Sequence, residues 1–202
     1  MSQSNVLKGR ALVALAILAS LLSFAKFSHC ENTGWATPDQ YIHACYSDLP
    51  SLYEARGLST NQWPYASADN SVEYPVITGL VMYLTSFVAN SPASYFNINI
   101  LFLVLLFIAT VIVVRKIRPE FAYLVPVAPA MIASLFINWD LWAIATMMVA
   151  IYWFDRKQYL GSALVDSASS CCAGARRGAP YGQQCAHRSS LRRTGAATGA
   201  EW

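Results

Sequence analysis

The sequence predicts an all-α integral membrane protein with about four transmembrane helices. Hydrophobic residues fill 55% of the 202 positions and charged residues only 12%, whereas a soluble domain carries about a quarter charged residues. Long apolar stretches alternate with polar ones, and basic clusters directly follow several of the apolar stretches. These observations indicate that residues 1–165 form one membrane domain.

The first apolar stretch, residues 11–25, follows a polar start that carries Lys8 and Arg10. A basic start before a short apolar core is typical of a signal peptide, but residues 23–25 form a poor cleavage site. With its flanks the stretch covers residues 7–28, which is long enough to cross a bilayer. We expect a retained transmembrane helix, with a cleaved signal peptide as the alternative.

Residues 29–75 form a polar connection in which we expect short helices near the membrane surface. Glycine and proline residues divide it into short pieces. A connection of this length in a compact protein is usually functional. Its charges are six acids and one strong base: Glu31, Asp39, Asp48, Glu54, Asp69, Glu73 and Arg56.

Three further spans are predicted at residues 97–114, 120–137 and 140–155. The apolar stretch 76–89 is short for a span, so we expect an interfacial or re-entrant helix there, with crossing as the alternative. Four spans place all the basic clusters on one side of the membrane, as the positive-inside rule requires. This topology predicts a plasma-membrane protein with a cytoplasmic N-terminus and with the loop 29–75 and Asp140 outside the cytoplasm.

We expect residues 166–202 to be a disordered tail. Of these 37 residues, 23 are Ser, Ala, Gly or Arg, and little apolar surface is available to offset the entropy cost of ordering. The composition is also typical of a shifted reading frame beyond Leu164. The whole net charge of +3 lies in the tail, because residues 1–165 carry nine basic and nine acidic residues, so the charge does not indicate nucleic-acid binding.

The cysteines fall into two groups. Cys30 and Cys45 both lie on the predicted outer side, where a disulfide is permitted and would add roughly 3 kcal/mol, but the sequence leaves its formation open. The other group lies in the tail with a histidine, and its spacing matches no regular zinc pattern, so we predict no metal site. That group consists of Cys171, Cys172, Cys185 and His187.

Asp48 is the best candidate for a catalytic residue. A carboxylate beside an aromatic-rich, partly dry membrane surface can act as a general base. The alternative is a structural role, because Ser47-Asp48-Leu49-Pro50 is also typical of a helix start, with either Asp48 or Ser47 as the N-cap. Capping would not exclude chemistry.

Four other residues are candidate substrate contacts. Arg56 is the only Lys or Arg between residues 29 and 74, and it can clamp a phosphate or form a plain salt bridge. Glu73 can bind a cation or a sugar hydroxyl, or favour a helix start through the dipole. Tyr74 belongs to an aromatic group suited to a membrane interface or to stacking on sugars. Asp140 is an acid in apolar surroundings, with helix capping as the alternative.

Several short motifs follow one another along the chain. They are Cys45-Tyr46-Ser47-Asp48-Leu49-Pro50, Leu52-Tyr53, Arg56-Gly57-Leu58, Pro64-Tyr65, Glu73-Tyr74-Pro75-Val76-Ile77-Thr78-Gly79 and Ile137-Asn138-Trp139-Asp140-Leu141. In this order they resemble actinobacterial multi-pass membrane proteins of glycosyltransferase family 87, the polyprenol-phosphate-mannose-dependent mannosyltransferases of the GT-C class. The resemblance covers residues 10–164.

The resemblance implies transfer of mannose or a related hexose from a polyprenyl-phosphate sugar to a lipid or glycan acceptor outside the cytoplasm. By position, Asp48 is the acid that would act as the base, and no cofactor is implied beyond the lipid-linked donor. The family continues with further spans where this sequence departs after Leu164, which implies an N-terminal fragment lacking part of the donor site. The alternative function is a non-enzymatic membrane protein, such as a small transporter or an assembly subunit.

Overall fold

The computed structural model describes residues 3–67, 71–156 and 164–165. The predicted tail 166–202, with its cysteines and His187, lies outside these residues. Throughout the described part of the chain, every regular element is helical. The elements are α1 (Gln3–Thr33), α2 (Asp39–Ile42), α3 (Asp48–Ala55), the 3₁₀-helix η1 (Leu58–Thr60), α4 (Val76–Ser86), α5 (Pro92–Ile117), α6 (Leu124–Val127), α7 (Pro129–Ser134) and α8 (Asp140–Asp155).

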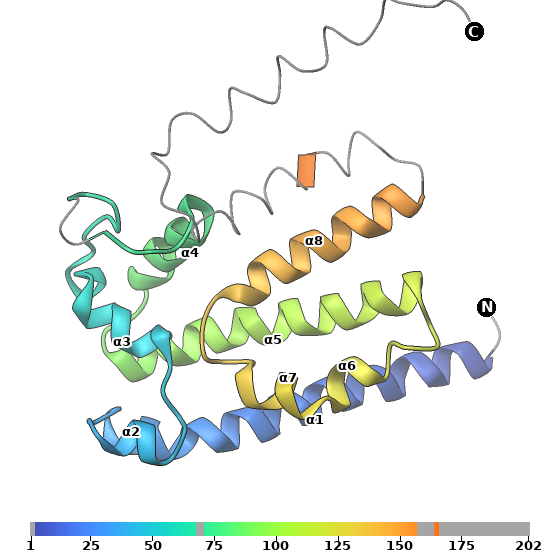
Figure 1. Cartoon of the computed structure of the whole chain (residues 1–202), viewed down its shortest axis with the longest axis horizontal. Coiled ribbons are helices and arrows are strands. Elements are labelled where there is room, and N and C mark those ends of the chain that lie inside the picture. Colours follow the sequence, from blue (N-terminus) through green and yellow to red (C-terminus); the bar gives the residue numbers. More distant parts are fainter. Residues whose placement is uncertain (1–2, 68–70, 157–163, 166–202) are drawn as a thin grey trace, which may run out of the picture.

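Two helices are long and apolar enough to cross a membrane. They are Leu7–Thr33 within α1 and the whole of α5, with 27 and 26 residues respectively. Helix α5 lies between α1 and α8 and packs against both (Figure 1). By length and composition these two helices indicate association with a membrane.

The predicted span 120–137 is not one continuous helix. Helices α6 and α7 divide it, and Ala128 between them is extended, with φ −67° and ψ 122°. Pro129 lacks a backbone N–H and disfavours helical geometry at the residue before it. Both short helices pack along α1, so this segment still runs the length of the bundle (Figure 1).

The chain direction alternates through α1, α5, the α6–α7 segment and α8 (Figure 1). One end of the bundle therefore gathers basic residues that are far apart in the sequence. The Arg115 guanidinium contacts Gly9, and the hydroxyl of Tyr123 donates to the Lys8 carbonyl at 3.0 Å. Lys116 and Arg156 both lie over the Tyr152 ring. The predicted clustering of these charges is present in the fold.

The opposite end carries the short helices α2, α3, η1 and α4, together with the first turns of α5 and α8 (Figure 1). Helix α4 has 11 residues, a length of about 16 Å, and it stays at this end. The core at this end of the bundle is aromatic and fully buried. The largest buried side chains here are Trp139, Tyr95, Phe27, Phe96 and Phe136.

The disulfide that the sequence left open is present. Cys30 of α1 bonds to Cys45, which lies just before α3, and both residues are fully buried. The bond closes a separation of 15 residues and fixes α2 and its flanks against the end of α1. The polar connection is thus tied to the longest helix of the described chain.

Candidate functional site

The start of α3 is held by Ser47. Its side-chain oxygen accepts a hydrogen bond from the backbone N–H of Leu49 at 3.3 Å, and its hydroxyl donates to the Phe136 carbonyl at 2.8 Å. The backbone N–H of Asp48 donates to the Ile137 carbonyl at 2.7 Å. The residues just before α8 therefore fix where α3 begins, although they are about 90 positions away in the sequence.

The Asp48 carboxylate does not cap α3, because Ser47 fills that position. The interpretation of Asp48 as the N-cap is wrong, whereas the alternative with Ser47 is confirmed. One carboxylate oxygen accepts the hydroxyl of Tyr46 at 2.7 Å, and the other accepts the hydroxyl of Tyr74. Asp48 is partly buried in this arrangement, so its side chain is both oriented and reachable.

Both tyrosines are stable hydrogen-bond donors. Burial raises the pKa of Tyr46 to about 12, and its hydrogen bond to Asp48 and the charge of Asp48 act in the same direction. Burial also raises the pKa of Tyr74 strongly, followed by the hydrogen bond to Asp48 and the charges of Asp48 and Asp140. Since both hydroxyls stay protonated near neutral pH, the Asp48 oxygens are held as acceptors.

Tyr74 is supported by buried side chains behind it. Its ring packs edge-on against Trp139 with 5.4 Å between centroids, and its carbonyl accepts the Tyr65 hydroxyl at 2.6 Å. The Trp139 indole N–H donates to the Asn99 side-chain oxygen of α5 at 2.8 Å, and both residues are 1% exposed. Helix α5 is thus linked by direct contacts to Tyr74, which donates a hydrogen bond to Asp48.

Asp140 is brought close to this site. It is the first residue of α8, and its negative charge contributes to the raised pKa of Tyr74. Asp140 does not cap the helix by its side chain; instead the Asn138 oxygen accepts the Asp140 backbone N–H at 3.1 Å. Asn138 also donates to the Asp140 carboxylate at 3.0 Å. Both residues line a cavity of about 170 Å³, whose other walls are Met131, Ser134, Leu135, Ile137, Leu141 and Ile144.

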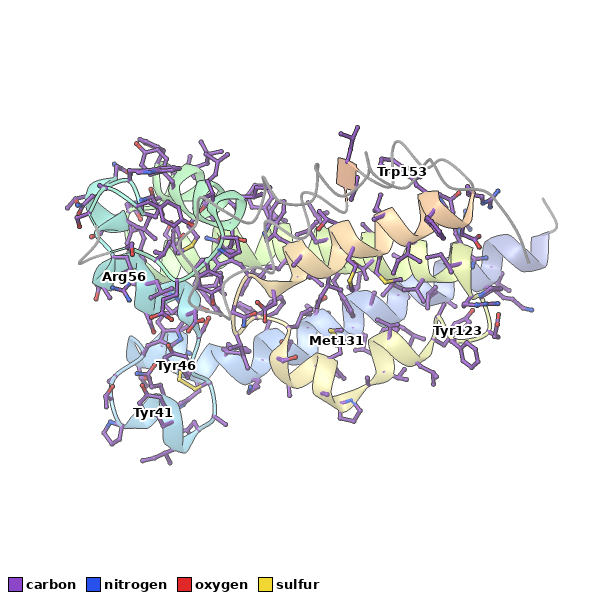
Figure 2. All side chains as sticks on the ribbon, turned by 45° about the horizontal axis from the view of Figure 1, so that its top comes forward. Tyr41, Tyr46, Arg56, Tyr123, Met131 and Trp153 are labelled. Carbon is purple, nitrogen blue, oxygen red and sulfur yellow. A yellow bond between two sulfur atoms is a disulfide. The ribbon has the colours of Figure 1, made fainter. Side chains whose placement is uncertain are left out.

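Arg56 and Glu73 come together, but away from Asp48. Arg56 directly follows α3 as its C-cap, so it lies about 12 Å along the helix axis from Asp48 at the start. Its guanidinium lies 3.9 Å from the Glu73 carboxylate, which is 92% exposed. The Arg56 Nε is buried and has no hydrogen-bond partner among the described residues. Figure 2 shows Tyr46 and Arg56 at this end of the bundle and Tyr123 and Trp153 toward the other.

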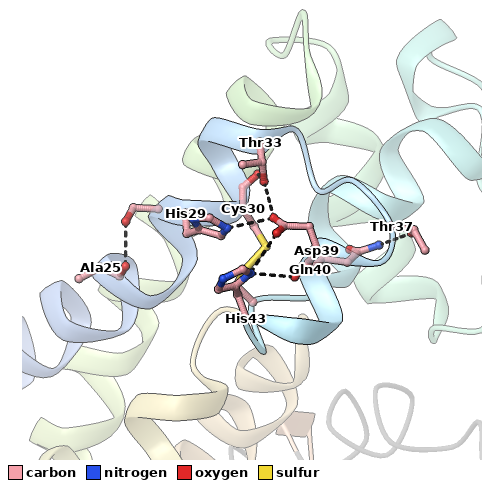
Figure 3. The surroundings of a disulfide bond; sticks show 10 residues. Ala25, His29, Cys30, Thr33, Thr37, Asp39, Gln40 and His43 are labelled. Carbon is pink, nitrogen blue, oxygen red and sulfur yellow. Dashed lines mark hydrogen bonds and ion pairs between the residues drawn. A yellow bond between two sulfur atoms is a disulfide. The ribbon is translucent and has the colours of Figure 1, made fainter.

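A second polar cluster surrounds Asp39, beside the disulfide (Figure 3). Its carboxylate lies 3.0 Å from His29 Nε2 and 3.0 Å from His43 Nδ1. Thr33 donates to the same carboxylate at 3.0 Å. This hydrogen bond is the main reason that the pKa of Asp39 is lowered, followed in the same direction by the two histidines. Among the described residues, this group has the arrangement that could hold a metal ion.

The segments that carry the family resemblance assemble at this end of the bundle. Asp48 and Tyr74 meet directly, and Asp140 lies nearby. Sequence reasoning missed Tyr46 and Asn99 as parts of the site. Tyr46 lies two residues before Asp48, a usable local signal, whereas the contact of Asn99 with Trp139 spans 40 residues and has none.

Comparisons with models of protein families, with curated proteins and with solved structures found no match for this chain. The resemblance to glycosyltransferases therefore stays a prediction. What can be argued for function comes from the geometry: a partly buried carboxylate with two phenol donors, a second carboxylate nearby, and a cavity beside it.

Proposed function

We propose that this chain acts in membrane glycosyl transfer, moving a hexose such as mannose from a polyprenyl-phosphate sugar to an acceptor hydroxyl. The single observation that carries the proposal is the Asp48 carboxylate, oriented by Tyr46 and Tyr74 at the polar end of a bundle of apolar helices. A general base needs such an oriented carboxylate that still has free lone pairs.

The proposal includes a membrane topology. Helices α1, α5 and α8 and the broken α6–α7 segment cross the bilayer, and α4 lies at the outer surface. The basic end faces the cytoplasm and the Asp48 end faces outward, in agreement with the positive-inside rule. A broken helix at membrane depth is tolerated where it packs on protein, and α6 and α7 both pack on α1.

In the proposed reaction, Asp48 takes the proton of the acceptor hydroxyl while that oxygen attacks the anomeric carbon of the donor. The bond from the anomeric carbon to the phosphate oxygen breaks, and polyprenyl phosphate leaves with the electron pair. Each carboxylate oxygen of Asp48 accepts one tyrosine hydrogen bond, which leaves it a second lone pair. Tyr46 and Tyr74 therefore position the base without blocking it.

The cavity beside Asp140 supports binding of an amphipathic substrate. Its walls are largely apolar, while Asn138 and Asp140 present polar groups that suit sugar hydroxyls. Arg56 and Glu73 lie at the far end of α3, so they would contact an outer part of the donor or acceptor instead of the reacting atoms. The unpartnered Arg56 Nε suits an anionic group.

The test is sugar transfer from polyprenol-phosphate-mannose in membranes that contain the chain. We expect Asp48→Asn to lower the rate about 10²- to 10⁴-fold, because the amide cannot accept the proton. Glu54→Gln is the matched control, since Glu54 lies in the same helix and is exposed.

Equal transfer by wild type and Asp48→Asn would remove Asp48 from the role of base. No transfer by the wild-type chain would contradict the enzymatic proposal and favour a non-enzymatic membrane protein. Loss of transfer in Glu54→Gln as well would show that the assay reports general damage to α3.

A further inference from the structure

The cluster around Asp39 combines side chains from two helices. His29 lies in the last turns of α1, Asp39 is the first residue of α2, and His43 directly follows α2 as its C-cap. One potential ligand atom from each residue lies within 4.8 Å of the other two. The two imidazole rings also lie close together, tilted by 45° and with 4.0 Å between their centroids (Figure 3).

These three groups are a ligand set for a transition-metal cation. Zn²⁺ binds imidazole nitrogens and carboxylate oxygens at about 2.0 to 2.2 Å, so neighbouring ligands in a tetrahedral site lie about 3.3 Å apart. Each histidine nitrogen already lies 3.0 Å from an Asp39 oxygen. Small side-chain shifts would therefore seat an ion among the three groups. We propose that His29, Asp39 and His43 bind Zn²⁺, with a fourth position open to water.

The disulfide organises this site before any ion binds. His29 directly precedes Cys30, and His43 lies two residues before Cys45. The Cys30–Cys45 bond therefore holds the two histidines together, although they are 14 positions apart. The single turn of α2 then places Asp39 between them, at an i,i+4 spacing from His43.

Thr33 supplies a hydrogen bond from outside the three ligands. Its hydroxyl donates to the Asp39 oxygen that faces His29, at 3.0 Å. Partners of this kind fix the orientation of a metal-binding carboxylate. The side chains of His29 and His43 are 45% and 49% exposed, so an ion can reach the site from solvent.

The spacing explains why the sequence predicts no metal site. His29, Asp39 and His43 are separated by ten and four positions and contain no paired-cysteine motif, because both nearby cysteines are used in the disulfide. The cysteines and histidine of the tail lie outside the described residues. An experiment must therefore separate the two groups of possible ligands.

The test is Zn²⁺ binding by the purified full chain in detergent, measured by competition with a chromophoric chelator. The tail ligands are first removed by Cys171→Ser, Cys172→Ser, Cys185→Ser and His187→Gln. We expect this chain to bind one equivalent of Zn²⁺. Asp39→Asn and His43→Gln should each weaken Zn²⁺ binding about 100-fold or more. Thr33→Val keeps all three ligands and should weaken it about 10-fold. Glu54→Gln is the matched acidic control and should bind normally.

Co²⁺ provides a second readout that does not depend on variants. Bound at this site, it should show visible ligand-field bands without the thiolate charge-transfer bands of a cysteine site. Unchanged Zn²⁺ affinity in both Asp39→Asn and His43→Gln would overturn the proposal. Loss of Zn²⁺ binding on removal of the tail ligands would also overturn it.

Discussion

Asp39 and Asp48 are two aspartates in similar positions with different partners. Each is the first residue of a short helix at the same end of the bundle. Asp48 is partly buried and accepts hydrogen bonds from two tyrosine hydroxyls. Asp39 lies between two exposed histidines and accepts a hydrogen bond from Thr33.

The difference shows that the partners, more than the carboxylate, decide what such a residue can do. A phenol with a raised pKa remains a donor, so it can orient a base but cannot share a cation. A neutral imidazole carries a lone pair and can bind the same ion as the carboxylate. Asp48 is therefore suited to proton transfer, and Asp39 to cation binding.

Removal of the disulfide is expected to have the largest effect on stability, and it should affect the region around Asp39 more than the region around Asp48. We expect Cys30→Ser with Cys45→Ser to lower the free energy of unfolding by about 3 kcal/mol, because the unfolded chain loses a closed loop. Chemical unfolding in detergent measures this change. Limited proteolysis should show new cleavage around residues 34–44, while α3 stays protected, because its start is held by carbonyl groups before α8. Equal cleavage in both regions would contradict this separation.

A smaller effect is expected when one hydrogen-bond donor is removed at each aspartate. Tyr74→Phe keeps the ring against Trp139 but removes a hydrogen bond to Asp48, so we expect a loss of about 1.5 to 3 kcal/mol in unfolding free energy. Thr33→Val removes the hydrogen bond that exposed Thr33 donates to Asp39, and it should lower the unfolding free energy less than Tyr74→Phe does. Equal losses in the two variants would show that the burial of the donor does not distinguish the sites.

The smallest effects are those of pH, and they have opposite directions. The raised pKa of Tyr46 favours its neutral form in the fold, so this contribution to stability is complete below pH 10 and is lost as pH rises toward about 12. The lowered pKa of Asp39 favours its charged form, so that contribution is present above about pH 3.8 and is lost as pH falls. Phenolate absorbance measures the loss at alkaline pH, and acid unfolding measures the loss at low pH. Asp48→Asn should move the Tyr46 titration to lower pH, and an unchanged titration would contradict the assigned contacts.

Much of the fold follows from hydropathy alone. The helices at residues 7–28, 97–114 and 140–155 and the short helix after Pro75 are present, because long apolar runs satisfy their backbone groups internally as helices. The expectation of one continuous helix over residues 120–137 was wrong, although Pro126 and Pro129 were visible in the sequence. Composition predicted the apolar character, but the extended residue before Pro129 breaks the helix.

By itself, the sequence determined the all-helical class of the described fold and which residue types stand near its polar loop. Asp48 and Asp140 could be chosen as candidates because charged residues are scarce in this chain, and Tyr74 because it belongs to the aromatic group near the polar loop. Their meeting depends on Trp139, which packs against the Tyr74 ring and donates a hydrogen bond to Asn99 of α5, 40 positions earlier in the chain. Only the tertiary structure decided that contact, and it also placed Arg56 with Glu73 and His29 with His43. Such contacts depend on helix packing and a disulfide, which local sequence patterns do not encode.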